Sequence, residues 1–251
     1  TSTASFNCCC SSISIMGSLK NWDNKTWLSS NKYISHFCKY LGSKTKISKK
    51  TKVLDIGCGR AYIISKLQNK YKFTSKSVGI DIVKNRGIKK NIIFKKTDAI
   101  KYLSISNKKF DIILIKQTIH FFSSKKIKIL LDLAKRKLHK NGQIFIFSLK
   151  THNNEIPGFN QMNRLLKISL KKDKIIFKEI KNILKKLNIS YYNYKVVIPK
   201  DDYLFMLKNR YISCLLKMSK KILIDGIKEF KSMHNKKISF TDKLICIIYK
   251  N

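Results

Sequence analysis

From about Lys50 onward, short apolar runs alternate with longer segments in which apolar residues recur every three or four positions. The short runs are rich in Ile, Val and Phe and apolar on both faces, which is typical of parallel strands buried in an α/β protein. The longer segments have the period of amphipathic helices. Alternation of this length predicts a doubly wound α/β fold with a mostly parallel seven-stranded sheet, similar to a Rossmann fold. The expected strands are 52–57, 77–82, 91–98, 110–116, 143–149, 189–198 and 240–250.

The segments between the first strands predict helices over 61–71, 83–90 and 124–142. The last of these ends in an Asn-Gly pair, which favours the left-handed backbone that closes many helices. A further amphipathic helix is expected over 174–187, directly before the sixth strand.

The length of the chain predicts one large domain over 21–251, preceded by a flexible tail over 1–20. About forty residues, 199–237, separate the last two strands, which is too long for a hairpin turn, so this segment predicts a helical cap. The amphipathic pattern over 21–45 predicts lid helices that close over the same edge of the sheet.

The chain has 251 residues with 54 Lys and Arg against 14 Asp and Glu, a formal net charge of +40. Such a charge suits a nucleic-acid partner, because phosphates attract basic side chains. Lys, Asn and Ile are all abundant, however, as AT-rich codons alone would produce, and the lysines are spread along every segment. The charge therefore favours nucleic acid only weakly. No apolar run approaches the roughly 18 residues that a membrane span needs, so no membrane partner is expected.

Seven cysteines are present, but none forms a Cys-x-x-Cys pair or has a nearby His-x-x-x-His partner. Their spacing therefore predicts neither a zinc site nor another metal site. Solitary cysteines are typical of reduced, buried side chains in a cytoplasmic protein. The cysteines are Cys8, Cys9, Cys10, Cys38, Cys58, Cys214 and Cys246.

The stretch "TKVLDIGCGRAYIISKL" carries the most specific chemical signal, with Gly57 and Gly59 directly after an expected buried strand. Paired glycines let the backbone turn sharply and approach a ligand at the start of the next helix. The position where a dinucleotide-binding fingerprint has its third glycine is near Ile63, and no Gly-Lys-Ser/Thr follows. The motif therefore matches neither an NAD site nor a Walker loop.

Several motifs in the same order resemble those of class I S-adenosylmethionine-dependent methyltransferases, over the chain from about Asn21 to the C-terminus. They are "VLDIGCGRA", "VGIDIV" with Asp81, "FKKTDAI" with Asp98, "FDIILIKQTIHFF" and "LHKNGQIFIF". The resemblance implies the Rossmann-like methyltransferase fold, S-adenosylmethionine as cofactor, and methyl transfer as the reaction.

The resemblance also implies roles for individual residues. Asp81 is expected to hold the ribose hydroxyls, because an ionised carboxylate offers four acceptor sites to a diol. Asp98 is expected to bind the adenine amino group. Each aspartate taken alone, with Asp111 at a further strand end, could instead be a helix cap or a turn residue. The expected cofactor-binding residues are Asp55, Gly57, Cys58, Gly59, Asp81, Ile82, Asp98, Ala99, Lys116 and Gln117.

Three residues near the N-terminus, Trp27, Ser30 and Tyr33, follow one another at three-residue spacing. On one helical face they would close over the methionine end of the cofactor. An ordinary amphipathic core face explains Trp27 and Tyr33 about as well.

The loop after the fourth expected strand, "IKQTIHFF", lacks the Pro-rich motif of family members that methylate adenine or glutamine amino groups, and it lacks a Pro-Cys context. The position of His120 in this loop resembles that of a histidine in the small-molecule methyltransferases. His120 is expected to bind the acceptor and to act as its general base, since the unperturbed imidazole pKa lies near neutrality. The alternative is a packed histidine that orients the loop.

Within the expected cap, Arg210 and Tyr211 are candidate acceptor-binding residues. Arg210 is one of five arginines among many lysines, and a guanidinium can bind a carboxylate or phosphate with two hydrogen bonds. An anionic acceptor is therefore expected if Arg210 contacts it. A solvated helix residue is the alternative.

Three functions remain compatible with the sequence. The first is methyl transfer to an oxygen or sulfur of a small, optionally anionic metabolite. The second is an rRNA or tRNA methyltransferase assisted by the positive charge, for which RNA binding would depend steeply on salt. The third is a non-catalytic module that keeps the cofactor fold for interactions, against which the intact motif residues argue.

Overall fold

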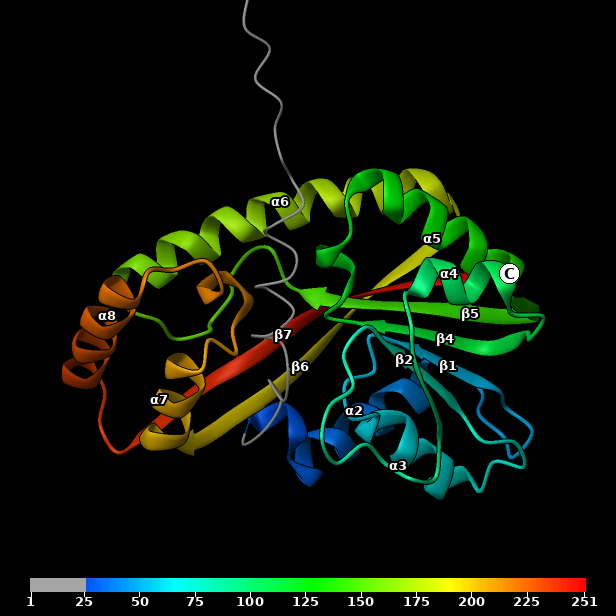
Figure 1. Ribbon diagram of the computed structural model, residues 1–251, viewed down its shortest axis with the longest axis horizontal. Helices are drawn as coiled ribbons and strands as arrows, with labels where there is room; N and C mark the ends of the chain where they lie inside the picture. The colour runs from blue at the N-terminus through cyan, green and yellow to red at the C-terminus, as the bar shows by residue number, and fades with distance from the viewer. Residues whose placement is uncertain (1–25) are drawn as a thin grey trace, which may run out of the picture.

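Seven strands form a single sheet in the order β3-β2-β1-β4-β5-β7-β6 in the computed structural model, in which residues 26–251 are described. The strands from β3 to β5 are parallel, and β7 runs antiparallel between β5 and β6 (Figure 1). The mostly parallel seven-stranded sheet predicted from the sequence is confirmed. The strands are β1 (Val53–Ile56), β2 (Val78–Asp81), β3 (Ile93–Lys96), β4 (Phe110–Lys116), β5 (Leu138–Leu149), β6 (Leu187–Pro199) and β7 (Lys237–Lys250).

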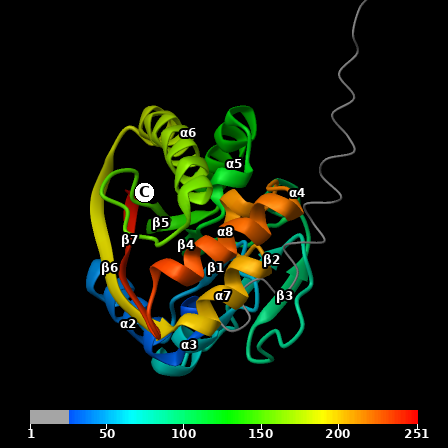
Figure 2. The ribbon, with the colours of Figure 1, turned by 90° about the vertical axis from the view of Figure 1, so that its left-hand side faces the viewer.

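Helices cover both faces of the sheet (Figure 2), because alternate strand residues point to opposite faces. Val53 of β1 packs in the cluster that includes α2 and α3, whereas Leu54 and Ile56 pack in the cluster that includes α4 and α5. All three side chains are buried. The helices are η1 (Trp27–Ser29), α2 (Asn31–Lys44), α3 (Tyr62–Tyr71), α4 (Ala99–Ile105), η2 (Ile119–Phe121), α5 (Ser124–Arg136), α6 (Asn160–Leu184), α7 (Lys200–Lys208), η3 (Ser213–Leu215) and α8 (Lys220–Met233).

Two sequence-based helix predictions are wrong. Residues 83–90 form turns and loop, with Gly87 at a φ of +73°, a conformation that interrupts a helix. The helix expected to end at Asn141 instead ends at Arg136, and β5 begins at Leu138. The Asn-Gly pair lies at an irregularity inside β5, where the pairing with β4 shifts register. Asn141 does adopt the left-handed backbone conformation, but it does so within the irregular part of β5 and not at the end of a helix.

Helix α6 begins at Asn160, well before the expected Lys174. It starts beside α8, beyond the carboxyl ends of the parallel strands, and runs back along the sheet toward α5 (Figure 1). Its first turns pack against η3 and α8. The Asn160 backbone N–H donates to Glu229 of α8 at 2.9 Å. A Cβ at Gly226 of α8 would lie 2.3 Å from the Phe159 ring, so α8 approaches the start of α6 more closely than any larger residue would allow.

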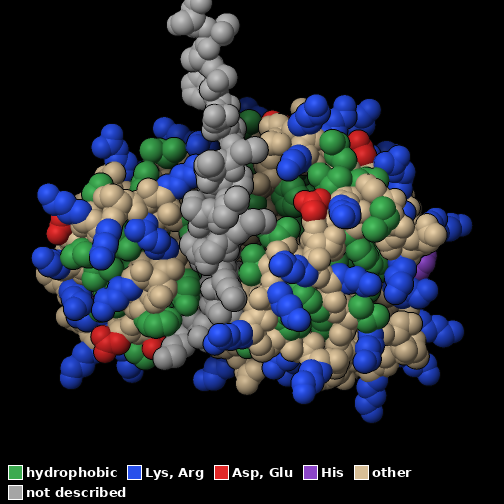
Figure 3. Space-filling view, viewed as in Figure 1, with side chains coloured by type: hydrophobic (Ala, Val, Ile, Leu, Met, Phe, Trp, Pro, Cys, Tyr) green, Lys and Arg blue, Asp and Glu red, His purple; other side chains and the backbone are tan. Residues whose placement is uncertain are grey.

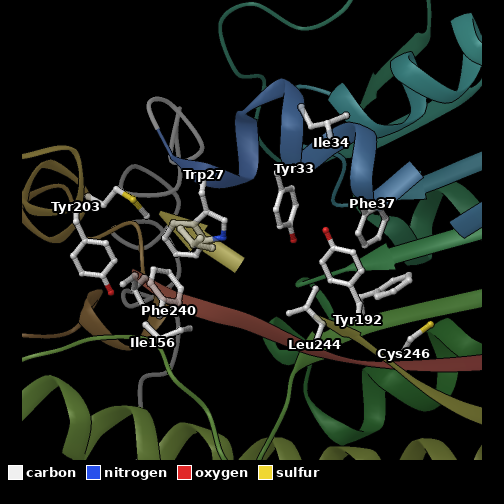
Figure 4. Packing of buried hydrophobic residues seen from close by; sticks show 14 of the residues in the cluster. Trp27, Tyr33, Ile34, Phe37, Ile156, Tyr192, Tyr203, Phe240, Leu244 and Cys246 are labelled. Carbon is white, nitrogen blue, oxygen red and sulfur yellow. The ribbon is translucent and has the colours of Figure 1, made fainter. Parts of the chain in front are cut away.

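Aromatic side chains connect the N-terminal helices to the β6–β7 segment (Figure 4). Trp27 lies parallel to Tyr203 of α7, with ring centroids 6.4 Å apart, and meets Phe240 of β7 edge to face at 5.1 Å. Tyr33 of α2 meets Tyr192 of β6 edge to face at 5.8 Å. Such pairs add to ordinary apolar burial. They hold η1 and α2 against the same end of the sheet as α7.

The visible face carries Lys and Arg scattered across its whole area without one dense patch (Figure 3). Within residues 26–251, no three His, Cys, Asp or Glu side chains gather as metal ligands, and no helix is long and apolar enough to cross a membrane. The expected tail over 1–20, with Cys8, Cys9 and Cys10, and the first residues of the expected lid over 21–45 lie outside the described residues. The four described cysteines, Cys38, Cys58, Cys214 and Cys246, are free thiols.

Candidate active site

A cavity of about 490 Å³ lies at the carboxyl ends of β1, β2, β4 and β5, where parallel sheets of this type bind ligands. One side, the cofactor wall, consists of Gly57, Asp81–Val83, Thr97–Ala99, Gln117, Thr118 and His120–Phe122. The other side, the cap wall, consists of Ser169 and Asp173 of α6, Met206 of α7, and Arg210–Ser213 with Leu216 around η3. Predicted site residues that line the cavity are Trp27, Gly57, Asp81, Ile82, Asp98, Ala99, Lys116, Gln117, His120, Arg210 and Tyr211.

The glycine pair forms a tight turn fastened to the end of β2. The backbone N–H groups of Gly57 and Cys58 both donate to the Ile80 carbonyl, at 2.9 and 3.1 Å. Gly57 has a φ of +73°, and a Cβ there would lie 2.2 Å from Oγ1 of Thr118. The β1 and β4 loops therefore touch at a point that admits only glycine.

Asp81 is held by backbone donors on both carboxylate oxygens. Its Oδ2 accepts from the Gly59 N–H and its Oδ1 from the Val83 N–H, each at 2.9 Å. Burial raises the pKa of Asp81 and these hydrogen bonds oppose that shift. Because each carboxylate oxygen can accept two hydrogen bonds, the fixed carboxylate keeps acceptor capacity for a ligand diol.

Two large apolar side chains of the cofactor wall are exposed, Ile82 at 40% and Phe121 at 48%. Exposed apolar surface in a cavity is a site for a flat apolar group. Nearby, Oδ1 of Asp98 accepts from the N–H groups of Ile100 and Lys101, at 2.9 and 3.0 Å. That oxygen therefore caps α4, as the alternative interpretation of Asp98 expected.

Lys116, at the end of β4, lies in a cluster of charged and aromatic groups. Its Nζ lies 3.3 Å from Oε1 of Gln117 and 5.2 Å from the centre of the Tyr33 ring. Burial lowers the pKa of Lys116 to about 8, although Asp242 and Asp55 act in the opposite direction. Burial also raises the pKa of Asp55 to about 7, which Lys116 partly counteracts.

Asp242 of β7 completes this cluster and was not predicted. Its Oδ2 accepts from the Tyr33 hydroxyl at 3.0 Å and from the Trp27 indole N–H at 3.3 Å. Its Oδ1 is buried without a hydrogen-bond partner. Burial raises the pKa of Asp242, and Lys116 opposes that rise. The only signal in the sequence was an acid inside an apolar strand, which does not reveal the tertiary partners.

A model of the methyltransferase domain family matches residues 47–195 of this chain. The chain belongs to that family. It is therefore an S-adenosylmethionine-dependent methyltransferase, as the sequence motifs predicted. No curated protein matches the sequence.

Solved structures with this fold include three with low sequence identity. The plantazolicin methyltransferase BpumL, in complex with a monoazolic desmethylPZN analog and SAH, is 17% identical with a TM-score of 0.51, over 92% of this chain and 88% of that one. The YcgJ protein of Bacillus subtilis is 18% identical with a TM-score of 0.50, over 86% and 98%. YjhP of E. coli is 10% identical with a TM-score of 0.53, over 94% and 99%. At these identities the similarity establishes the fold alone.

The cavity of this methyltransferase fits the cofactor in three respects. The carboxylate of Asp81 suits a ribose diol, and the exposed faces of Ile82 and Phe121 suit a purine ring. The ammonium group of Lys116, which lines the cavity, suits the carboxylate at the amino-acid end of the cofactor. These matches rest on this chain's own geometry.

Five predicted residues do not line the cavity: Asp55, Cys58, Gly59, Ser30 and Tyr33. Asp55 and Tyr33 are buried behind Lys116, and the Gly59 N–H orients Asp81. The predicted helical face that contains Trp27, Ser30 and Tyr33 is wrong, because α2 begins only at Asn31 and Ser30 is its N-cap. Ser30 accepts from the Tyr33 N–H at 3.2 Å.

Asp111 also departs from the pattern of strand-end acids. It lies at the start of β4, where it accepts from the Lys52 N–H at 2.7 Å and pairs with His139 at 2.9 Å. That is the edge of the sheet opposite the cavity, because β4 runs toward Lys116.

His120 belongs to η2, and its Nε2 is buried without a hydrogen-bond partner. Its ring lies against Phe121 at 4.2 Å between centroids. Burial lowers the pKa of His120 to about 4, so its imidazole is neutral at physiological pH. The residue lines the cavity, and its buried ring nitrogen lacks the hydrogen-bond partner that such a group normally has.

Arg210 lines the cavity, but one of its guanidinium nitrogens already serves the cap wall. Its Nη1 donates to the carbonyl of Leu215 at 2.6 Å and to that of Met218. Because Nη1 is used to hold the loop around η3, it is less available for the expected pair of hydrogen bonds to an anionic acceptor. The neighbouring Tyr211 lines the cavity and packs edge to face on Phe205 at 5.9 Å.

The cap wall also contains residues that no sequence motif had indicated as functional. Ser169 and Asp173 lie one turn apart within the long helix α6, most of which was not expected as a helix. Met206 and Ile156 add apolar surface. Ser169 and Asp173 reach the cavity because α6 extends beyond the sheet.

Proposed function

We propose that this methyltransferase transfers the methyl group to an oxygen or sulfur atom of a small acceptor molecule. The observation that carries the proposal is the cap wall, which stands over the carboxyl edge of the sheet and limits the cavity to about 490 Å³. That volume is in the range of small-ligand sites.

We infer further that residues 199–237, with the N-terminal helices, form a closing cap. Trp27 contacts Tyr203 of α7, and the Tyr203 hydroxyl donates to the Pro157 carbonyl at 2.5 Å. These contacts link three separate segments around one cavity. Closure would exclude water and align the acceptor with the methyl group, from which most of the rate enhancement of such a displacement arises.

When bound, the cofactor supplies a methyl group activated by attachment to a positively charged sulfur. The chain's own residues then have positioning tasks. Asp81 would hold the ribose, and Ile82 with Phe121 would flank the adenine. Lys116 would meet the amino-acid end of the cofactor, because its ammonium group lies at the end of β4.

His120 is the candidate partner for the reacting atom. Its unsatisfied Nε2 can accept a hydrogen bond from an acceptor hydroxyl or thiol and take the proton that methylation releases. A pKa of about 4 makes it a weak base. We therefore assign it chiefly the orientation of the acceptor. Proton uptake becomes favourable only as the new bond to the methyl group places positive charge on the acceptor oxygen or sulfur and makes its proton more acidic.

The experiment that tests the proposal is a metabolite screen with methyl-labelled cofactor, followed by mass spectrometry of labelled products. We expect label on an oxygen or sulfur of a small product, with His120→Ala lowering turnover about 100-fold while cofactor affinity stays nearly unchanged. His152→Ala, in an exposed loop, is the matched control. Transfer to RNA with a steep salt dependence, or cofactor binding without any turnover, would contradict the proposal in favour of one of its two alternatives.

A further inference from the structure

Asp173 is a buried acid of the cap wall for which residues 26–251 supply no hydrogen-bond or ion-pair partner. Its side chain is 6% exposed, and it lines the cavity from the middle of α6. Among the described residues it takes part in no hydrogen bond and no ion pair. Burial is the sole cause that raises the pKa of its carboxyl, to about 6, so no nearby cation offsets its burial.

Asp173 lacks a cationic partner among residues 26–251 although the chain is rich in cations. There are 54 basic residues for 14 acids, so a lysine partner is easily available. Other acids do have one: Asp132 pairs with Lys135, and Glu155 pairs with Lys243. A carboxylate that lies mostly out of water without a protein donor is unfavourable, because nothing replaces the hydration that it loses. Such a group commonly belongs to a ligand site.

The surroundings of Asp173 limit the ligand's chemistry. Ser169 lies four residues earlier on α6, hence on the same face, and adds a hydroxyl. Most of the remaining cap wall is apolar, with Met206, Ile212 and Leu216. A ligand that satisfies this wall has an apolar body and one group that donates hydrogen bonds to a carboxylate.

We propose that Asp173, assisted by Ser169, binds a positively charged amine of the methyl acceptor and so sets the acceptor class as apolar molecules with one amino group. This inference rests on the proposed function, since it concerns the acceptor of that reaction. Asp173 lies on α6, which packs against η3 and α8, and not on the β1, β2 or α4 segments expected to hold the cofactor.

The amine is an anchor and not the methylated atom. A protonated amine paired with a carboxylate has no lone pair for attack on a methyl group. The anchor also replaces the anionic acceptor expected from Arg210, because Nη1 of Arg210 is bonded to the cap carbonyls. An acceptor bound by Asp173 is positively charged, whereas an acceptor bound by Arg210 would be negatively charged. The two hypotheses therefore predict opposite preferences between an amine and a carboxylate of the same shape.

The test uses two matched ligand pairs, tyramine with 4-hydroxyphenylacetate and tryptamine with indole-3-acetate. Binding is measured by calorimetry on the full chain saturated with S-adenosylhomocysteine. We expect each amine to bind at least about tenfold more tightly than its carboxylate, a difference of about 1.4 kcal/mol. Asp173→Asn, which keeps the shape and removes the charge, should abolish this preference. Asp225→Asn, at an exposed position on α8, is the charge-matched control and should retain it.

Tighter binding of the carboxylates, no measurable binding of either amine, or a preference that persists in Asp173→Asn would overturn the inference. The affinity for S-adenosylhomocysteine itself is measured separately. If it is absent in the wild-type protein, the proposed function fails. If it is present and unchanged in Asp173→Asn while the amine preference is missing in the wild type, only the assignment of Asp173 fails.

Discussion

The cofactor wall and the cap wall face each other across one cavity but are built on different principles. On the cofactor wall, backbone groups fix the polar side chains: the N–H groups of Gly59 and Val83 bind Asp81, and Asp98 caps α4. On the cap wall, Asp173 has no hydrogen-bond or ion-pair partner in the described part of the chain. A wall fixed by backbone suits a ligand that never changes, whereas an unsatisfied side chain suits the ligand that distinguishes one enzyme from another.

The two walls also differ in how they are held in place. Parallel strands and short loops support the cofactor wall, and Gly57 contacts Thr118 directly. Aromatic contacts and hydrogen bonds across segments far apart in sequence support the cap wall, among them Tyr203 with Pro157. We therefore expect changes in the cofactor wall to cost both stability and cofactor affinity, and changes in the cap wall to act locally.

The largest expected effect concerns Gly57→Ala. A Cβ there would lie 2.2 Å from Thr118 in a backbone conformation with φ of +73°. We expect a loss of stability of about 4 kcal/mol or more and loss of measurable cofactor binding. Gly87→Ala has the same φ but open space around the new Cβ, so it should cost only about 1 kcal/mol. Urea unfolding of both variants measures the difference, and equal costs would refute the role of the contact with Thr118.

The second effect is a pH dependence from Asp55. Its folded pKa of about 7 lies above the ordinary value of 3.8, so the folded state binds the extra proton between these values. Stability therefore falls as pH rises from about 4 to about 7. Asp55→Asn cannot ionise, so its stability relative to wild type should increase across this window, by up to about 4 kcal/mol. Denaturant titrations at several pH values test this; a constant difference would show that Asp55 is charged throughout.

The third effect is on ligand binding alone. Asp81→Ala removes a charged hydrogen-bond acceptor from the cofactor wall, and we expect cofactor affinity to fall by about 2 kcal/mol, or roughly 30-fold. Calorimetry with S-adenosylmethionine measures it. Asp202→Ala, at an exposed position in α7, should bind the cofactor like the wild type. Unchanged affinity in Asp81→Ala would remove its assignment to the ribose.

The smallest expected effect concerns Arg210→Lys, which tests whether Arg210 holds the loop of the cap wall. Because Nη1 fastens the Leu215 and Met218 carbonyls, Arg210→Lys should weaken this loop by about 1 kcal/mol. Hydrogen exchange of residues 213–218 should accelerate severalfold while cofactor affinity stays the same. Lys208→Ala, exposed at the end of α7, is the control. Unchanged exchange in this loop with a large loss of turnover would restore Arg210 as a direct ligand of an anionic acceptor.

The sequence by itself determined the sheet and the cofactor wall. Buried strands carry continuous apolar runs, and the Gly57 turn and Asp81 follow their strands within a few residues, so local pattern and spacing were enough to find them. The sequence-based prediction was wrong where one local pattern is compatible with two structures. The Asn141-Gly142 pair often follows the end of a helix, but in this protein it lies at an irregularity within β5. Ser30 likewise appeared part of a helical face although it begins the helix.

Only the tertiary structure decided the contacts that give the site its charge. Asp242 meets Trp27 and Tyr33 across more than 200 residues of sequence. Asp173 reaches the cavity because α6 extends beyond the sheet, and Arg210 bonds to the loop that follows it. Hydrophobic periodicity specifies which face of an element is buried, because burial is a property of each segment. It does not specify which buried polar group meets which other, since that depends on how separate segments pack together.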